Sequence, residues 1–184
     1  GNMSGMVIAH YILSQRKENH TLPANGALVK TIVTTNMADA LAKAFDVKLI
    51  EVLTGFKYIG EQIKFFEQQH TWQYVFGLEE SYGCLVGTHA RDKDAVVCAC
   101  LIAEMAAESL TRKETLLDRM DGLFRRYGIY EESLLSVNLK GSEGLAKING
   151  IMEFLRNSPP SQFLGSPIVL VRDYLKDEVL NTQS

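Results

Sequence analysis

Carboxylate, hydroxyl and cationic side chains gather in one stretch of the sequence, residues 72–94. Glu79 and Ser81 lie two positions apart in an acidic loop bounded by glycines, and Arg91 and Lys93 follow it. An ionised carboxylate accepts hydrogen bonds from two hydroxyls at once, and cations suit a phosphate group. One interpretation is therefore a site for a phosphorylated sugar, in which Glu79 and Ser81 bind neighbouring ring hydroxyls. The other is a solvated loop with charges near a helix start, and spacing alone leaves both open.

The elements that would position these side chains follow from the flanking sequence. Residues 72–76 are aromatic and β-branched, and we expect a buried strand there that Gly77 ends. Residues 95–103 are apolar on nearly every face, which predicts a buried helix with Asp92 as its N-cap. The helix start would point free N–H groups at the loop, so we expect the carboxylates and both cations to lie around one site between the loop and the helix start.

A βαβ unit precedes this stretch. Strands are predicted over residues 27–34 and 47–53, with a helix from Asn36 between them, and a right-handed crossover is the default. A further helix over residues 56–68 leads to the strand before the acidic loop. Residues 54–55 follow the second strand, so they and the acidic loop should lie on the same edge of the sheet.

The remaining periodic segments predict further helices and strands. Their boundaries follow from apolar spacing and from the positions of glycine and proline. We expect helices over residues 5–17 and 114–127 and from Gly141, strands over residues 129–138 and 167–174, and a linker-like stretch over residues 157–161.

Composition describes an ordinary globular chain. With 184 residues, 46% of them hydrophobic, it can bury a core, and its net charge of -3 gives no case for binding nucleic acid or an anionic membrane. We expect neither a membrane span nor a signal peptide. Cys84, Cys98 and Cys100 do not resemble a disulfide framework or a metal site, so we expect structural thiols and a cytoplasmic location.

Two ordered motifs carry a family resemblance. Residues 77–83, Gly-Leu-Glu-Glu-Ser-Tyr-Gly, and residues 91–94, Arg-Asp-Lys-Asp, resemble the E-E-S-[FY]-G and R-x-K-D signatures of the α-D-phosphohexomutases, particularly the phosphoglucomutase branch. Upstream, residues 53–60 resemble that family's T-G-[FW]-K segment. The resemblance extends from about Gly1 to about Tyr174 and implies the third domain of a four-domain enzyme.

The resemblance implies the fold and the domain organisation. We expect an α/β fold, a three-layer α/β/α sandwich with a mixed, mostly parallel sheet of about four strands. Residues 1–140 would be the sugar-binding domain. Residues 141–184 would be a C-terminal helix and strand extension toward an absent fourth domain.

The implied activity is that of an intramolecular phosphotransferase, which interconverts hexose 1-phosphate and hexose 6-phosphate through a phosphoserine and a bisphosphate. The family's T-A-S-H-N-P serine loop, D-x-D-x-D-R loop for Mg²⁺ and R-x-S-G-T phosphate loop do not occur in this sequence. We therefore expect a fragment that is inactive alone, with Mg²⁺ bound elsewhere in the full-length enzyme. Its partners would be a hexose phosphate and other domains of the same polypeptide.

Individual roles are implied in the same way. Glu79 and Ser81 would bind the adjacent 3- and 4-hydroxyls of the sugar in either orientation, and Lys93 would assist charge or proton transfer as a catalytic residue. Arg91 would be a phosphate contact or a support for the loop. Glu80 would brace the loop through backbone N–H groups instead of touching sugar.

Other positions carry less defined expectations. Thr54 and Gly55 would shape a close backbone approach, because glycine allows unusual φ. Lys57 would contact the substrate or point into solvent, and His89 would contact ligand or pack in the loop. Glu79 and Ser81 would not contact the 2-hydroxyl, so the choice among glucose, mannose and pentose phosphates as substrate stays open. The alternative function is a non-catalytic α/β binding or regulatory domain.

Overall fold

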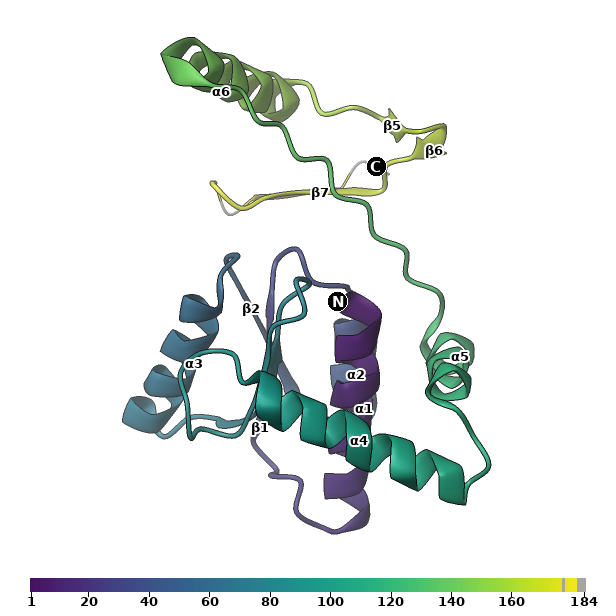
Figure 1. The fold of residues 1–184 in the computed structure, drawn as a ribbon. Coiled ribbons are helices and arrows are strands. Elements are labelled where there is room, and N and C mark those ends of the chain that lie inside the picture. Colours follow the sequence, from purple (N-terminus) through teal and green to yellow (C-terminus); the bar gives the residue numbers. More distant parts are fainter. Residues whose placement is uncertain (177, 182–184) are drawn as a thin grey trace. The chain divides into compact units, whose positions relative to one another are not determined.

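The structure is a computed structural model that describes residues 1–176 and 178–181 (Figure 1). The chain divides into two compact units, Gly1–Glu132 and the residues from Ser133 onward. All of the candidate site residues lie in the first unit.

The first unit is built on a four-stranded sheet. Its strands are β1 (Gly26–Thr31), β2 (Lys48–Val52), β3 (Gln73–Leu78) and β4 (Cys84–Val86), in the order β2-β1-β3-β4. Strand β1 is parallel to β2 and to β3, while β4 is antiparallel to β3. The predicted mixed, mostly parallel sheet is therefore confirmed. The carboxyl ends of β2 and β3 lie at one edge, as expected for the two motifs that follow them.

Helices cover both faces of this sheet (Figure 1). The helix α3 (Phe56–Gln69) packs on one face, where Val29 of β1 joins its apolar cluster. Leu28 of β1 belongs to a second cluster on the other face, because successive strand residues point to opposite sides. Helices on that second face are α1 (Asn2–Glu18), α2 (Met37–Phe45), α4 (Ala95–Thr111) and α5 (Leu116–Tyr127). These three layers confirm the predicted sandwich.

Helix α4 departs from its prediction as a buried helix. It buries one stripe, Cys98, Met105 and Ser109, while Val96 and Leu110 are 74% and 75% exposed. Uniform hydrophobicity predicts burial on every side, but α4 packs on α1, α5 and β4 through one face and leaves the opposite face exposed.

Two strand predictions also differ from the structure. Strand β3 continues through Gly77 to Leu78, and β4 was not predicted, because three residues are too few to show a period. The segment from residue 128 to 140 forms no helix or strand, so the predicted strand over residues 129–138 is wrong. Apolar residues there, such as Leu134 and Leu135, are exposed, and no strand among the described residues pairs with this segment.

The second unit contains the helix α6 (Gly141–Asn157) and two small antiparallel hairpins. These pair β5 (Gln162–Phe163) with β6 (Ser166–Pro167) and β7 (Leu170–Asp173) with β8 (Glu178–Asn181). Arg156 Nε donates to Asp173 Oδ2 at 2.6 Å, which ties α6 to β7. Within the described residues of both units, every helix is too short or too polar to cross a membrane.

Candidate functional site

The acidic loop is the connection between β3 and β4. The amide of Glu79 donates to the carbonyl of Gly83 at 2.9 Å, and the pair Leu78–Cys84 continues the hairpin below it. Closing the hairpin at this point leaves the Glu79 residue only 9% exposed, whereas Ser81 at the tip is exposed. The structure therefore holds Glu79 at the base of the loop and presents the Ser81 residue to solvent.

Glu79 lies beside Lys93, as the sequence predicts. Lys93 Nζ is 3.9 Å from Glu79 Oε1 and 5.3 Å from the ring centroid of Phe56, the first residue of α3. A Cβ on Gly83 would lie 2.5 Å from both Glu79 Oε1 and Lys93 Cδ, so any larger residue there would make these side chains shift. Phe56 belongs to the upstream motif, so the two separate motifs meet around one ammonium group.

Lys93 is held as a cation. Its Nζ donates to Asp92 Oδ1 at 2.9 Å, and this hydrogen bond is the main cause that raises the pKa of Lys93. The charge of Glu79 raises that pKa further, while partial burial opposes both. The same hydrogen bond is the main cause that lowers the pKa of Asp92. A protonated Lys93 next to Glu79 can stabilise negative charge or donate a proton, but it is a poor base.

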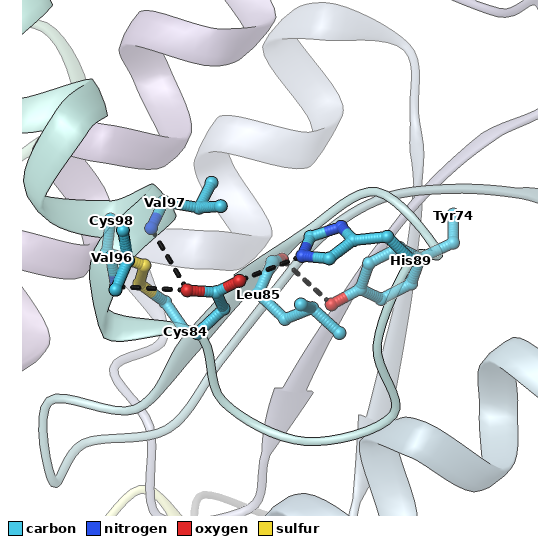
Figure 2. The surroundings of a disulfide bond; sticks show 8 residues. Tyr74, Cys84, Leu85, His89, Val96, Val97 and Cys98 are labelled. Atoms are coloured by element: carbon cyan, nitrogen blue, oxygen red, sulfur yellow. Dashed lines mark hydrogen bonds and ion pairs between the residues drawn. A yellow bond between two sulfur atoms is a disulfide. The ribbon is translucent and has the colours of Figure 1, made fainter.

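The start of α4 fixes the backbone next to Lys93. Asp94, and not Asp92 as predicted, is the N-cap, and its Oδ1 accepts from the amides of Val96 and Val97 at 3.0 Å each. His89 Nε2 lies 2.9 Å from Asp94 Oδ2 (Figure 2), and this contact is the main cause that lowers the pKa of Asp94. Of the two roles expected for His89, the contacts describe packing within the loop.

Arg91 binds partners other than Glu79 and Lys93. Its guanidinium binds both carboxylate oxygens of Glu67 on α3, at 2.7 and 2.8 Å, and donates to the carbonyls of Thr88 and Ala90. The expectation that Arg91 joins Lys93 at a phosphate group stays a prediction. The contacts describe its second expected role, support of the loop.

The upstream motif begins where β2 ends. Gly55 has φ 123 and ψ 130, a conformation that side chains rarely adopt, and it precedes α3 directly. Thr54 is exposed beside it. Lys57 is exposed, with its Nζ 4.7 Å from the ring centroid of Tyr58. These positions allow the backbone approach expected of Thr54 and Gly55, and they place the Lys57 residue toward solvent.

The residues that form this site lie in a part of the chain that matches a known protein family. The sequence model of one family, described as phosphoglucomutase/phosphomannomutase, alpha/beta/alpha domain III, matches residues 1–127. The chain belongs to the phosphoglucomutase/phosphomannomutase family. The matched range contains the hairpin loop, Lys93 and the upstream motif, so the candidate site lies entirely within the family's domain III.

Curated relatives of this phosphoglucomutase/phosphomannomutase domain are longer than the chain itself. It is 35% identical over 180 residues to the phosphoglucomutase of Staphylococcus aureus strain USA300, which is 97% of this chain and 31% of that protein. The phosphoglucomutase of strain MRSA252 is 34% identical over the same coverage. The chain therefore spans about a third of the length of these relatives.

A solved structure shows the same fold. The exocytosis-sensitive phosphoprotein pp63/parafusin of Paramecium, a phosphoglucomutase in its open form, has a TM-score of 0.59 to this chain. The alignment covers 99% of this chain and 31% of that protein at 20% identity.

The cysteines of this family member differ from expectation. Cys84 and Cys98 form a disulfide that joins the first residue of β4 to α4 (Figure 2), so the expectation of free thiols is wrong for these two. Cys100 is a free and exposed thiol. A single pair of cysteines 14 residues apart resembles any two scattered cysteines, so no disulfide pattern is visible in the sequence.

The end of β1 contains buried polar residues whose contacts are not among the predictions from the sequence. Lys30 and Thr31 are 0% exposed and Thr34 is 3% exposed, and this group contacts Glu80 of the loop. A signal was present, since a lysine within an apolar strand followed by hydroxyl residues marks buried polar contacts.

Proposed function

We propose that this chain is the sugar-recognition domain of a longer phosphohexomutase that interconverts hexose 1-phosphate and hexose 6-phosphate by way of a phosphoserine and a hexose bisphosphate. The observation that carries the proposal is the buried carboxylate of Glu79 at the end of β3, with the ammonium of Lys93 3.9 Å away. The family assignment supports it, because the curated relatives in that family are phosphoglucomutases.

Glu79 and Ser81 would bind the sugar. The carboxylate accepts hydrogen bonds from two neighbouring ring hydroxyls, and the hydroxyl of Ser81 lies in the same short loop and is open to solvent. A pair of adjacent hydroxyls presents itself similarly after the ring is turned over. The same two residues would therefore hold the bisphosphate in both of the orientations that the reaction requires.

Lys93 would act on charge near the sugar. Its raised pKa keeps it protonated near neutrality, so it favours anionic phosphate oxygens and can donate a proton to a leaving oxygen. Thr54 and Gly55 would admit the ligand close to the backbone. Arg91 and Lys57 would be secondary contacts, since Arg91 would first have to release Glu67.

The phosphoserine and Mg²⁺ would be supplied by other domains of the polypeptide. Among residues 1–176 and 178–181, no group of three or more His, Cys, Asp or Glu side chains is placed to hold a metal ion. The residues of this chain therefore do not fit the Mg²⁺ of the full-length enzyme, and no step here passes through it. The isolated chain should bind hexose phosphate weakly and show no mutase turnover.

The decisive experiment is an assay of the full-length polypeptide with glucose 1-phosphate, mannose 1-phosphate and ribose 1-phosphate. Turnover of a hexose phosphate that depends on Glu79 supports the proposal. Glu79 and Ser81 would not contact the 2-hydroxyl, so they leave the choice of sugar open. A preference for ribose 1-phosphate would indicate a phosphopentomutase. Sugar phosphate binding without turnover would indicate the non-catalytic domain instead. The proposed location is the cytoplasm, and it rests on the family alone, because the Cys84–Cys98 disulfide removes the argument from unpaired cysteines.

A further inference from the structure

A buried chain of hydroxyls connects the end of β1 to the acidic loop. Thr31 Oγ1 lies 2.7 Å from Thr34 Oγ1 and 3.2 Å from Glu80 Oε2. Both threonines are almost completely buried, so water does not compete for the bond between them, while the bond to Glu80 is partly buried. The connection spans distant parts of the sequence, since Thr31 and Glu80 are 49 positions apart.

The chemistry of the acceptor fixes the direction of this chain. An ionised carboxylate only accepts, so the proton between Thr31 and Glu80 must come from Thr31. A hydroxyl has a single proton to donate, so Thr31 must accept from Thr34. Both hydroxyls are therefore oriented toward Glu80, and each buried oxygen has a partner.

Thr34 is itself held in place by Lys30. The amide of Thr34 donates to the carbonyl of Thr31 at 3.0 Å, and its carbonyl accepts from Lys30 Nζ at 3.1 Å. The ammonium of Lys30 is completely buried and is compensated by Glu51 at 2.7 Å and by the Asn36 side-chain oxygen at 3.1 Å. A charge in this position cannot move without losing its partners, so it makes a rigid base for the two threonines.

The consequence concerns two adjacent acids with different partners. Glu80 binds the hydroxyl of Thr31, while Glu79 lies beside Lys93, consistent with the alternation of successive side chains after a strand. We propose that Glu80 is a positioning residue, held by the Thr31–Thr34 hydroxyl pair so that the neighbouring Glu79 faces Lys93 and the sugar. This inference rests on the proposed function, and it replaces the expected backbone N–H partners of Glu80 with threonine hydroxyls.

The test is a set of matched variants of the full-length polypeptide. Thr31→Val keeps the shape of the side chain and removes the hydroxyl, Thr31→Ser keeps the hydroxyl, and Thr35→Val removes a neighbouring buried hydroxyl that binds the amide of Met37 instead. Thr31→Val should raise KM for glucose 1-phosphate by about tenfold, the scale of one hydrogen bond to a charged group. Thr31→Ser should restore KM, and Thr35→Val should leave it unchanged.

A second measurement follows the loop directly. Amide hydrogen exchange of Glu79 reports the hydrogen bond to Gly83 that closes the hairpin, and it should speed up in Thr31→Val but not in Thr35→Val. Melting temperatures of all variants separate loss of stability from loss of position.

Each outcome bears on one claim. Unchanged KM and Glu79 exchange in Thr31→Val, in an enzyme that Glu79→Gln does impair, would overturn this inference and leave the proposed function intact. An equal effect of Thr35→Val, or no rescue by Thr31→Ser, would overturn it as well, because packing alone would then explain the result. If Glu79→Gln itself has no effect, the proposed function fails, and the positioning role fails with it.

Discussion

Lys93 Nζ lies 3.9 Å from Glu79 Oε1, close enough for electrostatic attraction but too far for a direct hydrogen bond. The ammonium instead donates to Asp92 at 2.9 Å. Glu79 therefore gains a compensating charge without giving up its lone pairs to Lys93. Those lone pairs stay available for two hydroxyls of a ligand, which is what a sugar-binding carboxylate requires.

Replacing Glu79 should be costly for this reason. In the full-length polypeptide, Glu79→Gln removes the charge and turns one of the two acceptor atoms into a donor. The transition state should lose about 2 kcal/mol or more of stabilisation, which lowers kcat/KM by roughly 30-fold or more. Steady-state kinetics with glucose 1-phosphate measure this. Unchanged kcat/KM would remove Glu79 from the site.

Replacing Lys93 should affect kcat more than KM. Lys93→Met retains an unbranched side chain over Phe56 but removes the cation, so charge that develops on transferring oxygens loses a partner, and kcat should fall by roughly tenfold or more. Lys93→Arg keeps the charge and should retain more of the activity. Equal kinetics of Lys93→Met and the unaltered enzyme would refute a role for the ammonium in the reaction.

The space around Gly83 permits a structural prediction in the isolated chain. Gly83→Ala places a Cβ 2.5 Å from Glu79 Oε1 and Lys93 Cδ, so both side chains must move, and stability should fall by about 1–3 kcal/mol. The matched control is Gly122→Ala in α5, where nothing lies within 4 Å. That change should be neutral or stabilise by about 0.5–1 kcal/mol, because alanine favours a helix. Urea unfolding of the two variants measures both, and equal stabilities would contradict the crowding at Gly83.

The sequence predicts this fold well where a period is long and a motif is specific. The helical stripes and buried strands place Glu79 at the end of β3 and Phe56 at the start of α3, because parallel strands bring their carboxyl ends to one edge. Residue types alone do not choose between Asp92 and Asp94 as the cap, since both are aspartates within three positions of Ala95, the first residue of α4. Only the path of the loop decides it, and the Asp94 amide donates to the carbonyl of Cys84 at 2.9 Å.

Contacts between side chains that are distant in the sequence could not be predicted. Arg91 binds Glu67, and Thr31 binds Glu80, over separations of 24 and 49 positions. No local sequence pattern predicts such pairs. The exposed face of α4 was missed for a related reason, since hydrophobicity reports what a helix can bury and says nothing of which neighbours are present.

Acid sensitivity of the first unit should depend on His10. This side chain lies on α1 between the rings of Phe45 and Tyr127, at 5.6 and 6.1 Å between centroids. Burial, aided by the charges of Arg126 and Arg119, lowers its pKa to about 4 from an ordinary value of 6.5. Its Nε2 is buried without a hydrogen-bond partner among the described residues, which fits a neutral ring.

The direction of the effect follows from this shift. Between pH 6.5 and about 4 the unfolded chain binds a proton at His10 that the folded chain does not, so the free energy of unfolding falls as the pH falls through this window. The loss should be on the order of 1–2 kcal/mol once partial solvent screening is allowed for.

His10→Phe keeps an aromatic ring between Phe45 and Tyr127 and should abolish most of this dependence of stability on pH. His20→Asn, at an exposed position, is the control and should leave the slope unchanged. Carboxylates with lowered pKa, such as Asp118, lose their contribution only below about pH 4, so urea unfolding of the three proteins at pH 7 and pH 5 isolates the histidine. A slope that persists in His10→Phe would show that the acid sensitivity has another source.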